Sequence, residues 1–274
     1  MPTRHPTRRD RLVNMLKSDV GAWCVLFIGL IALLTLTPPP QLATGSDTDR
    51  PAEVRFTEGP TWAGDSLLEH LASVAARQFH DAGGRDELIA IHDALARSGW
   101  FDSVRTVRRL ADGAIEVDAS FLIPVAVVQD QYGEVMVDAK GRTLPDGASV
   151  SSDHHVIHII NAQANRPSRP ARPWQGDDMA AGLDLHRRLT GHPWSHQIEA
   201  IDLSQYDRSG ALMLITGPHA RIRWGSAPGE ETPLETLADR KIVRLGEAFR
   251  THGRVDYNHQ GLIDLTVASH VINR

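Results

Sequence analysis

The chain has 274 residues, 41% of them hydrophobic, and this length suits one large or two modest folded domains. The net charge of -5 argues against a nucleic-acid-binding protein, whose contact face would be strongly basic. The one cysteine, Cys24, leaves no disulfide bond within the chain, so an apolar core has to hold the fold together.

Residues 20–37 contain no charged side chain, and they predict a single transmembrane helix. A helix of that length is roughly 27 Å long, close to the ~30 Å hydrocarbon core of a bilayer. Arginine and lysine predominate before this run, which predicts a cytoplasmic N-terminus and a C-terminal bulk outside the cytoplasm. A cleaved signal peptide is the alternative. The uncleaved anchor is favoured because the run exceeds the usual length of about 7 to 15 residues and residues 41–43 form a poor cleavage site.

This segment divides the chain into five predicted parts. They are a basic cytoplasmic tail (1–19), the transmembrane helix (20–37), a linker rich in Pro, Gly, Ser, Thr and Asp (38–52), a small domain (53–128) and a larger C-terminal β domain (129–274).

The small domain begins with residues 53–58, where apolar and polar side chains alternate as in a strand. A capping box, Ser66-x-x-Glu69, predicts the start of a first helix, and a second helix is expected from about Asp86 to Gly99. Two strands, 104–110 and 114–121, follow around an Asp-Gly turn. We expect a three-stranded sheet under two helices.

The larger domain is predicted to be a mixed β domain with at least two helices, which makes the fold class α+β. Its strands are expected at residues 156–160, 198–203, 211–216, 220–224, 254–257 and 262–268. One helix starts at about Asp177. Another covers residues 233–251, with Lys241 inside it and an apolar face made of Leu234, Ala238, Ile242, Leu245 and Phe249.

The predicted order strand, helix, helix, strand, strand, followed by Pro124-Val125-Ala126, resembles a POTRA domain. Residues 135–145 (VMVDAKGRTLP) and the terminal Ile263-Asp264-Leu265 are similar to motifs of the FtsQ/DivIB family of bacterial division proteins. Two departures stand out. Residues 121–123 lack the acidic residue usual in the family, and Thr266-Val267 stands where the family often has Arg-Tyr.

The resemblance implies a non-catalytic, single-pass protein of the bacterial inner (plasma) membrane, with its C-terminal bulk in the periplasm. Such a protein would link other single-pass septal membrane proteins during cell division and wall synthesis, without a cofactor, a metal, a nucleic acid or a small-molecule substrate. The partner would add a strand to an exposed sheet edge. By position, the predicted partner-binding residues are Leu262, Ile263, Asp264, Leu265, Thr266, Val267 and Ala268.

Two alternatives stay open. His154, His155 and His158 are the densest histidine group and could belong to an exported metal-dependent enzyme. Asp153 is the only acid beside them, whereas a zinc site needs three or four converging ligands. The second alternative is a POTRA protein of secretion or outer-membrane assembly, although no second domain of that kind follows in the sequence.

Overall fold

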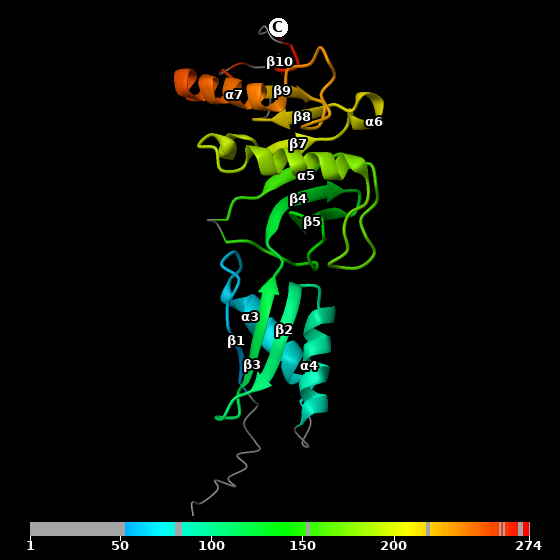
Figure 1. Ribbon diagram of the computed structural model, residues 1–274, viewed down its shortest axis with the longest axis vertical. Coiled ribbons are helices and arrows are strands. Elements are labelled where there is room, and N and C mark those ends of the chain that lie inside the picture. Colours follow the sequence, from blue (N-terminus) through cyan, green and yellow to red (C-terminus); the bar gives the residue numbers. More distant parts are fainter. Residues whose placement is uncertain are drawn as a thin grey trace, which may run out of the picture. The chain divides into compact units, whose positions relative to one another are not determined.

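The computed structural model describes residues 53–79, 84–151, 154–217, 220–257, 259, 261–267 and 271–273. These residues form a mixed α+β structure with one three-stranded and one eight-stranded sheet (Figure 1).

The predicted fold class included a membrane-spanning helix, and this part of it is corrected. Among the described residues, no helix is both long enough and apolar enough to cross a membrane. The longest is α7 (Ala238–His252), whose 15 residues cover only about 22 Å and carry charged side chains on one face. The predicted span, 20–37, lies outside the described residues, as do the predicted tail (1–19) and linker (38–52).

The small domain has the predicted element order. Strand β1 (Val54–Phe56) is followed by helices α3 (Asp65–Ala76) and α4 (Arg85–Arg97), then by strands β2 (Phe101–Arg109) and β3 (Ile115–Phe121). In the sheet, β3 lies in the middle, parallel to β1 and antiparallel to β2. The two helices supply apolar faces to the same core as this sheet, so the predicted arrangement is confirmed.

Burial in this core follows the sequence pattern, whereas the predicted start of the first helix does not. Alternate residues of β3 are buried, and Trp100 and Phe101 enter the core directly after α4. The predicted capping box is wrong. Helix α3 begins at Asp65, one residue before Ser66, and no side chain caps it. Asp65 itself lies in the first turn, where its negative charge suits the positive end of the helix dipole.

The predicted hairpin turn at Asp112-Gly113 is confirmed. The Asp112 carboxylate accepts a hydrogen bond from the Ala114 N–H at 3.0 Å, and Gly113 has a φ of +87°. This left-handed conformation is one that glycine adopts at little cost, because it has no Cβ atom.

The larger sheet is mixed, as predicted. Its strands in spatial order are β11 (Val271–Asn273), β10 (Gly261–Asp264), β9 (Ala220–Gly225), β8 (Leu212–Ile215), β7 (Ala200–Asp202), β6 (Ile157–Ile160), β4 (Pro124–Asp130) and β5 (Gly133–Asp138). The pairs β4–β6, β6–β7 and β9–β10 are parallel, and the other neighbours are antiparallel.

Helices α5 (Asp177–Leu189) and α7 lie along this sheet (Figure 1), with the short helix α6 (Tyr206–Ser209) and a 3-10 turn, Ser195–Gln197, in the connections. Apolar side chains of α5 and α7 belong to one core with residues from β4 to β10.

Three predicted boundaries in the larger domain are wrong. The helix expected at 233–251 starts only at Ala238, and Leu234 lies in the preceding loop with 95% of its surface exposed. Residues 254–257 form a turn instead of a strand, because Tyr257 has a φ of +56°, which a strand cannot accommodate. The strand expected at 262–268 ends at Asp264, where its carboxylate accepts the Thr266 N–H at 2.8 Å and turns the chain.

The small domain also contacts the loop before α5. Gly99, with a φ of +83°, follows α4, and a Cβ atom added there would lie 2.6 Å from the Pro170 Cβ atom. Gly99→Ala is therefore expected to lower the free energy of unfolding by about 2 kcal/mol, from backbone strain plus overlap. Gly113→Ala is the matched control, since Gly113 has a similar φ of +87° but open space around it. Urea unfolding of both variants measures the difference, and equal losses would refute the contact with Pro170.

Candidate protein-interaction surface

The histidine group does not converge. The His154 Nε2 atom lies 2.7 Å from the Pro124 carbonyl oxygen, while His155 and His158 are exposed. Burial, together with the neighbouring His155, lowers the pKa of His186 on α5 below its ordinary value. Among the described residues, no three side chains of the types His, Cys, Asp or Glu come close enough to hold a metal ion. Asp153 lies outside the described residues, so the described geometry gives the metal-dependent alternative no support.

The predicted partner-binding residues divide between strand β10 and the turn after it. Ile263 and Leu265 are buried in the core, as their alternation predicts. Val267, two residues further along, is exposed over 37% of its surface. Ala268 lies outside the described residues.

Strand β10 is paired on both sides. Leu262, Ile263 and Asp264 pair with β9 on one side and with β11 on the other. Among the described strands, the edge of the sheet at this end is therefore β11. A partner strand has to pair with β11 or to displace it, because the backbone groups of β10 already have partners.

Large apolar side chains are exposed beside this end of the sheet. We define the α7–β10 corner as Leu234, Leu237, Val243 and Val267, whose exposed fractions range from 37% to 95%. Hydrogen bonds to backbone groups join the segments that carry these side chains. The Thr236 N–H donates to the Thr266 carbonyl oxygen at 2.8 Å, and the Arg244 side chain donates to the Val267 carbonyl oxygen at 2.7 Å. Exposed apolar groups gathered in this way are typical of a surface that binds another protein.

The sequence pattern did not identify this corner. Leu234 was assigned to the inner face of a helix that begins four residues later, and Val243 lies beside the apolar stripe of α7. The available signal was Pro233, since proline and the residue before it often mark a helix boundary.

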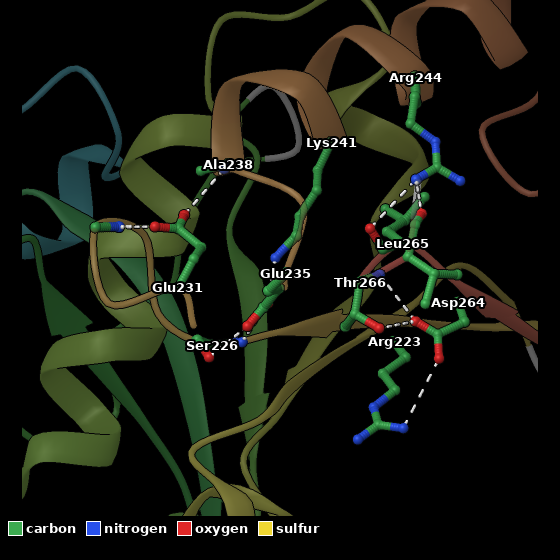
Figure 2. Close-up of polar contacts among 12 residues, drawn as sticks. Arg223, Ser226, Glu231, Glu235, Ala238, Lys241, Arg244, Asp264, Leu265 and Thr266 are labelled. Atoms are coloured by element: carbon green, nitrogen blue, oxygen red, sulfur yellow. Dashed lines mark hydrogen bonds and ion pairs between the residues drawn. The ribbon is translucent and has the colours of Figure 1, made fainter. Parts of the chain in front are cut away.

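A buried ion pair supports the loop that carries Leu234 and Leu237 (Figure 2). The Glu235 carboxylate lies 2.6 Å from the Lys241 Nζ atom and accepts hydrogen bonds from the Ser226 N–H at 2.9 Å and the Ser226 hydroxyl at 2.6 Å. Burial alone would raise the pKa of Glu235, but the hydrogen bonds from Lys241 and Ser226 outweigh it and hold the pKa below the ordinary value. The Lys241 Nζ atom also lies 5.0 Å from the centre of the Trp224 ring, within the range of a cation–π contact.

Glu231 fixes the start of α7. Its carboxylate accepts the Ala238 N–H at 2.9 Å and the Gly229 N–H at 3.0 Å. It thus satisfies a backbone donor of the first helical turn from outside the helix, where a negative charge also suits the helix dipole.

Arg244 of α7 holds the turn after β10. Its guanidinium donates to the carbonyl oxygens of Leu265 at 3.3 Å and Val267 at 2.7 Å (Figure 2). Its Nε and a second terminal nitrogen are buried and have no hydrogen-bond partner among the described residues. The same turn is closed by Asp264, which accepts two hydrogen bonds from Thr266. These contacts present Val267 to solvent next to α7.

The polar groups of this region thus fix the backbone, and four large apolar side chains are exposed beside charged ones such as Asp239 and Arg240. The arrangement suits recognition of another protein. In comparisons with known proteins, no family model and no curated protein matches this chain.

Proposed function

We propose that this chain is a non-catalytic scaffold of the FtsQ/DivIB type, which links septal proteins during cell division and wall synthesis. In this proposal a partner protein covers the α7–β10 corner and pairs with the sheet edge at β11. The observation that carries it is that large exposed apolar side chains lie in segments hydrogen-bonded to the turn after β10, the strand that pairs with the edge strand β11. An edge strand offers backbone hydrogen bonds, and neighbouring apolar side chains add affinity and specificity.

The chemistry of the corner supports a binding role over a catalytic one. Lys241 and Glu235 are buried against each other, and the Arg244 guanidinium donates to main-chain oxygens. These groups act on the fold itself. The proposed partners are other single-pass septal proteins, and no nucleic acid, cofactor or small-molecule substrate is involved. The location outside the cytoplasm stays a prediction, because it depends on residues 20–37.

The double substitution Leu237→Asp/Val243→Asp tests the proposal. Both side chains are more than half exposed, so the effect on folding should be small. We expect about a tenfold loss of co-purifying septal proteins, because charged groups replace apolar contacts at the centre of the interface. The measurement is affinity purification of the full chain from its own host cells, with quantitative mass spectrometry of the eluates.

Ile89→Asp is the matched control, since Ile89 of α4 is 48% exposed and lies in the small domain, away from the proposed surface. A second variant ends after Val267 and so removes β11 while keeping β10. Septal proteins recovered equally with all of these chains would contradict the proposed surface. Their absence from the wild-type eluate would contradict the division role itself.

A further inference from the structure

The opposite end of the eight-stranded sheet has an edge that is only partly covered. Strand β5 is the last strand there, and its outer side pairs with residues 142–144 over its second half. The Leu144 N–H donates to the Met136 carbonyl oxygen at 2.8 Å, and the Asp138 N–H donates to the Arg142 carbonyl oxygen at 3.0 Å. The covering segment therefore follows β5 only as far as Met136.

At the next residue the two segments separate. Pro145 follows Leu144, and in a continued ladder its backbone groups would face away from β5, with Asp146 opposite Glu134. The backbone N–H and C=O groups of successive residues in a strand point to alternate sides. Those of Met136 point outward, away from β4, so those of Glu134 point outward as well. No described strand pairs with Glu134 on that side.

A hollow of about 230 Å³ lies at this separation. Its walls are β5, one residue of β4 and the loop that leaves β5. The lining residues are Val127, Glu134, Val135, Met136, Pro145, Asp146, Gly147 and Ala148. Val127 is nearly buried and lies opposite Met136 on β5, so these two apolar side chains share one face of the sheet at the hollow. The hollow can take one apolar side chain from a segment lying along β5.

The rim of the hollow is acidic. Glu134 is exposed, and the Asp146 side chain is 90% exposed. Arg166 is the cation beside them, but it is bound to the Asp130 carboxylate at 3.0 and 3.1 Å and lies 3.6 Å from Asp146. It also donates to the Gly133 carbonyl oxygen at 3.1 Å and so closes the turn end of the open edge. The uncovered part is short and carries a surplus of negative charge.

We propose that this edge is a second docking site, for a short, extended and basic segment of a partner protein. The segment pairs with the outward backbone groups of Glu134 and places one apolar side chain in the hollow. Its lysine or arginine side chains lie near Glu134 and Asp146. This site is separate from the α7–β10 corner, which lies at the other end of the sheet. Either proposal can therefore fail without the other.

The test uses the full chain and a fluorescent hexapeptide with the sequence Lys-Val-Lys-Leu-Lys-Val, read out by fluorescence anisotropy. We expect binding, and at least tenfold weaker binding of the peptide in which glutamate replaces each lysine. Glu134→Pro should weaken binding of the basic peptide roughly tenfold, because proline is tolerated at an edge position but removes the outward N–H. Glu134→Lys/Asp146→Lys should weaken it at least as much. Glu69→Lys is the control, as an exposed glutamate on α3.

Several outcomes would overturn the proposal. They are no binding of the basic peptide by the wild-type chain, equal binding of the two peptides, or unchanged binding by both the proline and the double-lysine variants. Sedimentation velocity tests the remaining possibility, that a second copy of the chain pairs with this edge. A wild-type dimer that dissociates on Glu134→Pro would show that a second copy of the chain occupies the edge, which also overturns it.

Discussion

Replacing Lys241 by methionine is expected to lower the free energy of unfolding by about 4 kcal/mol. Lys241 is fully buried and only 7% of the Glu235 side chain is exposed, so the substitution leaves a carboxylate buried without its cation. Breaking a buried ion pair by removing one partner typically costs 3–5 kcal/mol, roughly what a buried unpaired charge costs. Methionine has nearly the length of lysine, which keeps the loss of packing small. Urea unfolding of the full chain, followed by tryptophan fluorescence, measures the change.

The double variant Lys241→Met/Glu235→Gln is the control for this loss. A neutral amide can still accept the Ser226 N–H, and removing both charges together is often nearly neutral. We therefore expect the double variant to recover more than half of the stability lost in Lys241→Met. A single variant within about 1 kcal/mol of wild type, or a double variant no better than the single one, would contradict a stabilising ion pair.

The pH dependence of stability gives an independent readout of the same pair. The pKa of Glu235 is lower in the folded chain than its ordinary value, which is about 4.3 in an unfolded chain. The resulting stabilisation is complete above that value and is lost as the pH falls through the folded-state pKa. In Lys241→Met the sign should reverse. Without the lysine, burial raises the Glu235 pKa, so stability should rise as the pH falls and the buried carboxylate becomes protonated.

The sequence predicted those parts of the fold that depend on local patterns. The period-two alternation of β3 identified a half-buried strand, and the apolar spacing around Ile91 and Leu95 identified α4. The Asp-Gly dipeptide predicted the turn between β2 and β3. Each signal lies within about ten residues of chain and needs no knowledge of distant contacts.

Features set by distant residues could not be predicted in the same way. The segment before α7 is held as a loop by a distant contact, because the Thr236 N–H donates to the Thr266 carbonyl oxygen in the turn after β10. The pairing of β10 with β11 depends on how the last residues return to the sheet, which no short motif encodes. The α7–β10 corner follows from both, and of its residues the sequence pattern placed Leu234 on the apolar face of a helix.

The second large effect is expected at Arg142, which joins the two sheets. Its guanidinium binds Asp138, the last residue of β5, at 2.6 and 2.8 Å, and Asp102 of β2 at 2.6 Å. Nearby, Leu144 from the larger domain is buried in the core of the small domain. The contact between the sheets is thus apolar at Leu144 and ionic at Arg142. Loss of the ionic part should weaken the coupling between the two domains.

Arg142→Gln is expected to lower the free energy of unfolding by about 3 kcal/mol. This loss is at the lower end of the 3–5 kcal/mol that breaking a buried ion pair typically costs. One reason is that 19% of the arginine side chain is exposed, and another is that the Asp138 carboxylate still accepts two backbone N–H groups in the variant. The hydrogen bond from Arg142 also holds the pKa of Asp102 below its ordinary value, so this pKa should rise in the variant. Lys140→Gln is the control, since Lys140 is 69% exposed and 3.6 Å from Asp102, and its loss should stay within about 0.5 kcal/mol.

Unfolding should also change in form. In the wild-type chain the contacts at Leu144 and Arg142 predict one transition, whereas Arg142→Gln should separate the transition of the small domain from that of the eight-stranded sheet. Hydrogen exchange measured by mass spectrometry distinguishes them, because β3 should then exchange at a lower denaturant concentration than β8. If Arg142→Gln and Lys140→Gln give the same stability and one common transition, Arg142 does not couple the sheets, and the apolar contact at Leu144 alone holds them together.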